Sequence, residues 1–130
     1  MSEAQQRELV SVLVIDDDDD IRDTLSEIMQ DLGYSVATAG NGADALMKLR
    51  GLKPQLILLD LSMPIMDGHE FRAEQVRDPA LAEIPTVVMT AADRAREKTA
   101  AMKPSDVLAK PVKLDVLLRQ LRRYCGASSA

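Results

Sequence analysis

The stretch Leu56-Ile57-Leu58-Leu59-Asp60 is the most informative segment of the chain, because four consecutive apolar residues end on one carboxylate. A short apolar run between Pro54 and Ser62-Met63-Pro64 is typical of a strand buried on both faces of a parallel sheet. Such a strand tolerates a charge only at an open end, where a cation or water can reach it. Open parallel sheets bind ligands at the carboxyl ends of their strands. The sequence therefore places Asp60 where an open α/β fold carries its chemistry.

Four other segments have the composition of short strands, and helix-forming segments separate them. The strands are expected over 11–15, 34–38, 85–90 and 107–109, and the helices over 21–32, 43–49, 68–77, 92–102 and 114–121. The third helix should turn Phe71 and Val76 inward, and the last should bury Leu114 and the leucines after it. This strict alternation with short connections predicts an α/β fold, a (βα)5 doubly wound parallel sheet with helices on both faces.

The composition indicates one acidic domain. The chain has 130 residues, 46% of them hydrophobic, and a net charge of -5. We expect a polar lead-in over 1–10, the domain over 11–124 and a frayed tail over 125–130. The acidic balance excludes nucleic acid as a direct partner, and no apolar run reaches the ~20 residues of a membrane span. The lone Cys125 fits a reducing, cytoplasmic location, and a single histidine excludes a His/Cys metal cage.

The predicted strands end on polar residues of particular kinds. The first ends on Asp16 and Asp17, the third on Asp60, the fourth on Thr90 and the fifth on Lys110. Carboxyl ends of parallel strands share one edge of the sheet, so three carboxylates should meet there and repel one another unless a cation intervenes. Oxygen ligands alone favour a hard cation such as Mg²⁺. A carboxylate nucleophile, a divalent metal and a positive donor together indicate phosphoryl transfer to aspartate.

The same residues belong to five short motifs that occur in a characteristic order. These are Val14-Ile15-Asp16-Asp17, Leu59-Asp60-Leu61-Ser62-Met63-Pro64, Met66-Asp67-Gly68, Met89-Thr90-Ala91 and Ala109-Lys110-Pro111. Through them the chain resembles a response-regulator receiver domain of two-component signalling, over about residues 11–124. The resemblance implies a flavodoxin-like fold with strand order 2-1-3-4-5, the order known for the chemotaxis member of this family.

The resemblance also implies a role for each site residue. Asp60 would accept a phosphoryl group from the phosphohistidine of a sensor histidine kinase or phosphotransfer protein. Asp17, Asp60 and the backbone carbonyl of Ser62 would bind Mg²⁺ directly, and Asp16 would act mainly through water. Thr90 and Lys110 would contact the phosphoryl oxygens. The Lys110–Pro111 bond is expected to be cis.

The chain departs from the family pattern around the fifth strand. Val107 stands where the family usually has an aromatic residue that swings inward on activation, and Val112 stands where Phe is frequent. The segment between Thr90 and Lys110 is about two residues short, and Lys103-Pro104-Ser105 replaces a Gly-containing turn. The residues that would carry out the phosphoryl chemistry are all present. These departures therefore concern how a change at Asp60 would be transmitted to the rest of the domain.

We expect a phosphorylation-dependent switch that signals to an unknown output protein and is not an enzyme. Two alternatives stay open: a degenerate receiver that serves as a scaffold, and an aspartate-dependent phosphohydrolase of the haloacid dehalogenase type. The second needs an acid/base Asp two residues after the nucleophile, where this chain has Ser62. The sequence leaves open whether the chain is a complete protein, and whether it is a monomer or a phosphorylation-dependent dimer.

Several polar and sulfur-containing residues fit ordinary structural roles. The acidic residues 18–20 are expected in solvent, and His69 is expected to be exposed at a helix start. Met63 and Met66 should pack within their loop, and Cys125 should be inert. None of these residues is therefore assigned to the site.

Overall fold

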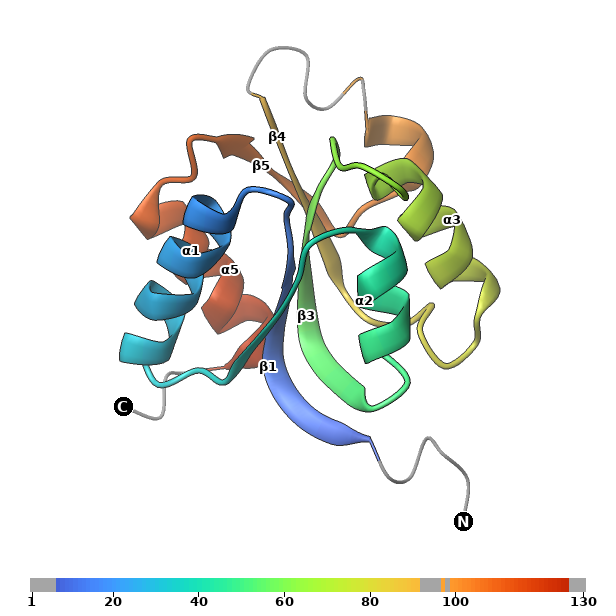
Figure 1. Cartoon of the computed structure of the whole chain (residues 1–130). Helices are drawn as coiled ribbons and strands as arrows, with labels where there is room; N and C mark the ends of the chain where they lie inside the picture. The colour runs from blue at the N-terminus through green and yellow to red at the C-terminus, as the bar shows by residue number, and fades with distance from the viewer. Residues whose placement is uncertain (1–6, 92–96, 98, 127–130) are drawn as a thin grey trace.

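The computed structural model describes residues 7–91, 97 and 99–126. Five parallel strands form one sheet in the order β2-β1-β3-β4-β5, as predicted. The strands are β1 (Glu8–Ile15), β2 (Val36–Ala39), β3 (Leu52–Asp60), β4 (Thr86–Ala91) and β5 (Asp106–Lys110). The helices are α1 (Asp19–Asp31), α2 (Gly42–Lys48), α3 (Gly68–Arg77) and α5 (Leu114–Cys125), with a 3-10 turn η2 (Ala100–Met102). Figure 1 shows α1 and α5 on one face of the sheet and α2 and α3 on the other.

The continuous apolar runs of the central strands follow from burial on both faces. In β1, Leu13 and Ile15 belong to the core beneath α2 and α3, whereas Val12 and Val14 belong to the core beneath α1 and α5. The residues of β3 alternate between the same two cores. Since neighbouring side chains of a strand point to opposite faces, a strand between two helical layers needs apolar residues at every position.

Several strand boundaries differ from the sequence-based expectation. β3 begins at Leu52 and so includes Pro54, which was expected to lie before the strand. β1 begins at Glu8 rather than at residue 11, because Glu8 and Leu9 pair with the start of β3. Leu9 is 75% exposed, so main-chain pairing, and not burial in the core, holds this end of the strand. β2 begins at Val36, two residues later than expected. Tyr34 is buried before β2, and its hydroxyl donates to the carbonyl of Gly126 at 2.8 Å.

The inward faces of two helices also differ from the expectation. Phe71 is fully buried as expected, but Val76 is 50% exposed and the neighbouring Gln75 is buried instead. The Gln75 amide is satisfied by hydrogen bonds to main-chain carbonyls and to Thr86, which removes the usual cost of burying it. In α5, Leu114 is exposed, whereas Leu117 and Leu121 are buried as predicted.

The expected helix over 92–102 lies largely outside the described residues, since 92–96 and 98 are not described. Its described end is the 3-10 turn η2, with Met102 buried against the α2–α3 core. The Lys110–Pro111 peptide bond is cis, as the resemblance implied. Among the described helices, none is long and apolar enough to cross a bilayer.

Cys125 is the single cysteine of the sequence, and its surroundings make it unreactive. Burial raises the pKa of its thiol to about 11, and Sγ lies 3.4 Å from the carbonyl oxygen of Ser11, to which it donates. Because the thiolate is the nucleophile, alkylation by iodoacetamide at pH 8 should be about 100-fold slower than for an ordinary exposed cysteine. Urea-unfolded protein should react at the ordinary rate, and equal rates in both states would contradict this assignment.

Candidate functional site

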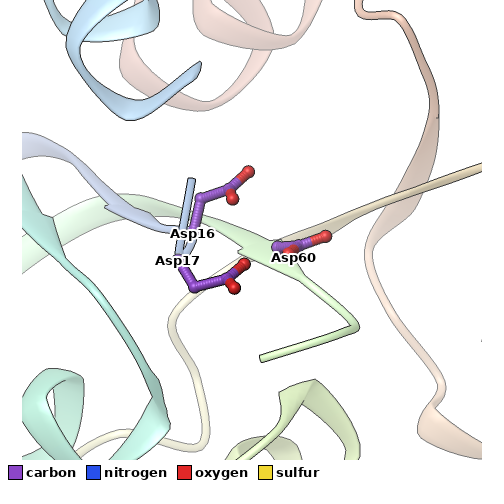
Figure 2. A group of neighbouring side chains, drawn as sticks. All are labelled: Asp16, Asp17 and Asp60. Carbon is purple, nitrogen blue, oxygen red and sulfur yellow. The ribbon is translucent and has the colours of Figure 1, made fainter. Parts of the chain in front are cut away.

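Three carboxylates meet where β1 and β3 end. Asp16 and Asp17 follow the last residue of β1, and Asp60 is the last residue of β3. One carboxylate oxygen from each of the three lies within 4.8 Å of the others, and Figure 2 shows the side chains gathered at this edge. Asp16 is fully buried and Asp60 is 6% exposed, whereas Asp17 is open to solvent. The sequence prediction that these strand ends converge is therefore confirmed for all three acids.

Lys110 lies between two of these carboxylates. Its Nζ donates to Oδ1 of Asp60 at 2.9 Å and to Oδ2 of Asp16 at 3.2 Å. Lys110 ends β5, and the cis bond that follows it begins the connection to α5. The ammonium group of an outer strand is thus brought to carboxylates that come from the two central strands.

Main-chain and side-chain groups fix Asp16 further. Its Oδ1 accepts from the backbone N–H of Asp18 at 3.0 Å, and Arg22 donates to its main-chain carbonyl at 2.8 Å. Asp18 itself caps α1, with its side chain accepting from the N–H groups of Asp20 and Ile21. The residues 18–20 are exposed as expected, but Asp18 has this definite structural role.

The described side chains of the site carry more negative than positive charge, and burial together with these charges changes the pKa values of Asp60 and Lys110. Burial raises the pKa of the Asp60 carboxyl above its ordinary value, and the charges of Asp16 and Asp17 add to the effect despite the hydrogen bond from Lys110. Burial alone would lower the pKa of Lys110, but its contacts with Asp60 and Asp16 raise it instead. Among the described residues, three acids and one ammonium group meet at this edge, so their negative charge exceeds the positive charge and a further cation can neutralise it.

A pocket opens beside the carboxylates. Its lining includes Asp17, Ser62, Met63, His69 and Thr90. Thr90 belongs to β4 and also lines the pocket. The residue before it, Met89, pairs with Asp60, so Thr90 lies on the strand next to the central carboxylate. The predicted site residues are therefore all on one edge of the sheet. His69 is exposed at the start of α3 as expected, and it lies on the wall of this pocket.

Two glycines hold the loop that carries Ser62 against the sheet. The N–H of Gly68 donates to the carbonyl of Leu61 at 2.9 Å, and the N–H of Gly42 donates to the carbonyl of Met66 at 2.9 Å. A Cβ on Gly68 would lie 2.6 Å from the main-chain oxygen of Asp60, and one on Gly42 would lie 2.7 Å from Met66. In the sequence Gly68 stands out only as part of a motif, and nothing there indicates a role for Gly42 at the site.

The methionines of this loop pack inward. Met63 and Met66 are partly buried against the α2–α3 core, which confirms the packing role predicted for them. Between them Ile65 has a left-handed φ of 68° and is 82% exposed. A β-branched residue seldom takes this conformation, so the surrounding loop contacts must hold it there.

The residues and geometry above match one protein family. A family model, the response regulator receiver domain, matches residues 12–122. The chain belongs to this family. Receiver domains are typically phospho-acceptors that interact with histidine kinases or phosphotransfer proteins.

Relatives of this receiver domain include both short and longer proteins. The chain is 36% identical over 120 residues to an uncharacterized 14.6 kDa protein of Leptolyngbya boryana, with 91% of the chain and 92% of that protein covered. It is 36% identical over 122 residues to response regulator MprA of a Mycobacterium strain, with 92% of the chain covered. The match covers 52% of MprA, so the chain spans about half the length of that regulator.

Solved receiver structures have the same architecture. Chemotaxis response regulator CheY4 of Vibrio cholerae superposes with a TM-score of 0.80 at 32% identity, covering 90% of this chain and 99% of CheY4. Response regulator TrrA of Thermotoga maritima, in complex with Mg²⁺–BeF, superposes with a TM-score of 0.78 at 28% identity. That match covers 88% of this chain and 98% of TrrA.

Replacing Gly68 with alanine should destabilise the receiver domain by about 2 kcal/mol, because the new methyl group cannot fit against the end of β3 without moving the loop. Gly51→Ala is the matched control, since the nearest atom to its added Cβ is 4.0 Å away. Urea unfolding of both variants measures the difference. If Gly68→Ala and Gly51→Ala have equal effects on the free energy of unfolding, the close contact at Gly68 does not restrain the loop.

Proposed function

We propose that this receiver domain is a phosphorylation-dependent switch in which Asp60 accepts a phosphoryl group from a histidine kinase or phosphotransfer protein. The observation that carries the proposal is the position of Lys110, whose Nζ bridges Asp60 and Asp16 at the open edge of the sheet. A structural ion pair requires one carboxylate for one ammonium group. Here Asp16 and Asp60 both contact one lysine, and an oxygen of Asp17 lies within 4.8 Å of theirs beside a pocket, which is an arrangement suited to an incoming anion and its counter-cation.

The transfer step follows from these contacts. A carboxylate oxygen of Asp60 attacks the phosphorus atom of the donor phosphohistidine, and an acyl phosphate bond forms. The bond between phosphorus and the imidazole nitrogen breaks, and its electron pair stays on the imidazole. Lys110 can then donate to a phosphoryl oxygen in place of Asp60, and the hydroxyl of Thr90 can donate from β4. Lys110 and Thr90 would therefore change their hydrogen-bond partners when Asp60 is phosphorylated.

The donor set fits Mg²⁺. Asp17 and Asp60, with the backbone carbonyl of Ser62, would hold the ion directly, and Asp16 would hold it mainly through water. All of these donors are oxygen atoms, and a few carboxylates with several waters are what Mg²⁺ favours in proteins. When bound, the ion neutralises negative charge on the phosphoryl oxygens. The complex of TrrA with Mg²⁺–BeF supports this assignment from a protein of the same fold.

The proposed switch accounts for the site better than the two alternatives. A phosphohydrolase would need a second acid/base group near the phosphorylated residue, and Ser62 occupies the position where that class has an aspartate. A scaffold that never receives phosphate would have no need for the complete set of acids, Thr90 and Lys110. We therefore propose that the output is altered binding to another protein and that the domain works in the cytoplasm.

Phosphoryl uptake tests the proposal directly. Incubation with ³²P-labelled acetyl phosphate should label the protein only when Mg²⁺ is present. Asp60→Asn should abolish labelling, because an amide is a poor nucleophile. Asp18→Asn is the matched control: it alters the same acidic loop, and asparagine also caps a helix well, so labelling should be unchanged.

Three results would count against the proposal. Normal labelling of Asp60→Asn would place the acceptor elsewhere, and absence of labelling and of any response to beryllofluoride in the unmodified sequence would favour the scaffold alternative. Sustained hydrolysis of p-nitrophenyl phosphate that depends on Asp60 would instead favour the phosphohydrolase.

A further inference from the structure

A second polar cluster lies at the other end of α3, away from the carboxylates. Gln75 is fully buried, and its Nε2 donates to the carbonyls of Leu81 and Ile84 and to Oγ1 of Thr86 at 2.9 Å. Its Oε1 accepts from Nη1 of Arg72 at 2.8 Å. Thr86 is also fully buried and begins β4. These hydrogen bonds tie α3 to the first residue of β4.

Arg72 extends this cluster to η2. Its Nε donates to the carbonyl of Met102 at 3.0 Å, and its Nη2 donates to the carbonyl of Lys103 at 2.9 Å. Lys103 follows η2 with a left-handed φ of 49°. One planar guanidinium group therefore holds two successive carbonyls at the end of η2 and, through Nη1, the buried amide of Gln75.

The elements joined by Arg72 have their opposite ends at the candidate site. α3 begins at Gly68, whose N–H is bonded to the carbonyl of Leu61 directly after Asp60. β4 ends beside Thr90, which lines the pocket. Arg72 joins η2 to the ends of α3 and β4 that lie away from the site. It can therefore affect any movement of α3, β4 and η2 that modification of the site causes.

We propose that Arg72 is a positioning residue that holds η2 against α3 in the unmodified protein and so restrains the change that follows phosphorylation. This inference rests on the proposed function. Its direction follows from geometry: any displacement of η2 relative to α3 must stretch the bonds from Arg72 to Met102 and Lys103. The described arrangement keeps both bonds, so Arg72 favours it over any arrangement in which η2 has moved away from α3.

The contacts of Arg72 differ from those of a surface ion pair. All of its described acceptors are neutral, namely the carbonyls of Met102 and Lys103, the Gln75 amide and the Thr86 hydroxyl. Removing its charge therefore leaves no described carboxylate without a partner. Arg77, on the same helix, is exposed and pairs with Glu74 at 3.1 Å, so it provides a matched arginine that contacts neither β4 nor η2 through a described hydrogen bond.

The test is a titration with beryllofluoride in Mg²⁺, followed by amide NMR shifts. Arg72→Met keeps the length of the side chain but removes its donors, so the beryllofluoride concentration at half-saturation should fall at least fivefold. In Arg72→Lys, which keeps the charge without the planar fork, it should fall about twofold. Arg77→Met should match the unmodified sequence. Hydrogen exchange at the Lys103 and Ser105 amides should rise at least tenfold in Arg72→Met only.

The outcomes separate this inference from the proposed function. If Arg72→Met exchanges faster at Lys103 and Ser105 but keeps the same half-saturation concentration, Arg72 has only a structural role and the inference is wrong. A spectrum of the unmodified sequence that does not change in beryllofluoride would overturn the proposed function itself. Should Arg72→Met fail to fold, Arg72→Lys decides: an unchanged or raised half-saturation concentration overturns the inference.

Discussion

The central interaction of the structure is the contact of the Lys110 ammonium group with the carboxylates of Asp60 and Asp16 at the edge of a parallel sheet. Lys110 contacts Asp60 and Asp16, while Asp17 lies nearby with no described hydrogen bond to the lysine. Each acid comes directly after a run of four buried apolar residues or directly after its neighbouring acid, so the rigid inner part of each strand fixes where the charged side chains lie. The strand ends and the loop residues Ser62 and Met63 line the same pocket, and under the proposed function this pocket admits a metal ion and a phosphoryl donor.

The alternation of side chains along β1 and β3 produces this arrangement. Val12, Val14 and Asp16 follow one another at every second position, as do Leu56, Leu58 and Asp60. Both series run along the face covered by α1 and α5, which brings Asp16 and Asp60 together beside the lysine of β5. The two carboxylates that contact Lys110 thus lie where the alternating apolar residues of two adjacent strands end.

Much of the fold and of the site could be predicted because its signals are local. Strands buried on both faces leave continuous apolar runs, and the site residues directly end those runs or stand in short motifs. Buried polar groups leave no such signal: Gln75 and Arg72 find their partners only in three dimensions, so hydrophobic periodicity placed Val76 inward instead. The early start of β1 and the left-handed Ile65 likewise depend on contacts with distant segments.

The central claim is that the carboxylates at this edge require a cation, which Lys110 provides and Mg²⁺ can supplement. The most direct measurement is the free energy of unfolding of Lys110→Met and of the unmodified sequence as a function of Mg²⁺ concentration. Methionine resembles lysine in shape, so the variant should be less stable without Mg²⁺, and the gap should narrow at millimolar Mg²⁺ as the ion replaces the lost charge. Two results would contradict the account. One is a Lys110→Met variant with the same free energy of unfolding as the unmodified protein in the absence of Mg²⁺, and the other is a variant whose free energy of unfolding does not change with Mg²⁺ concentration.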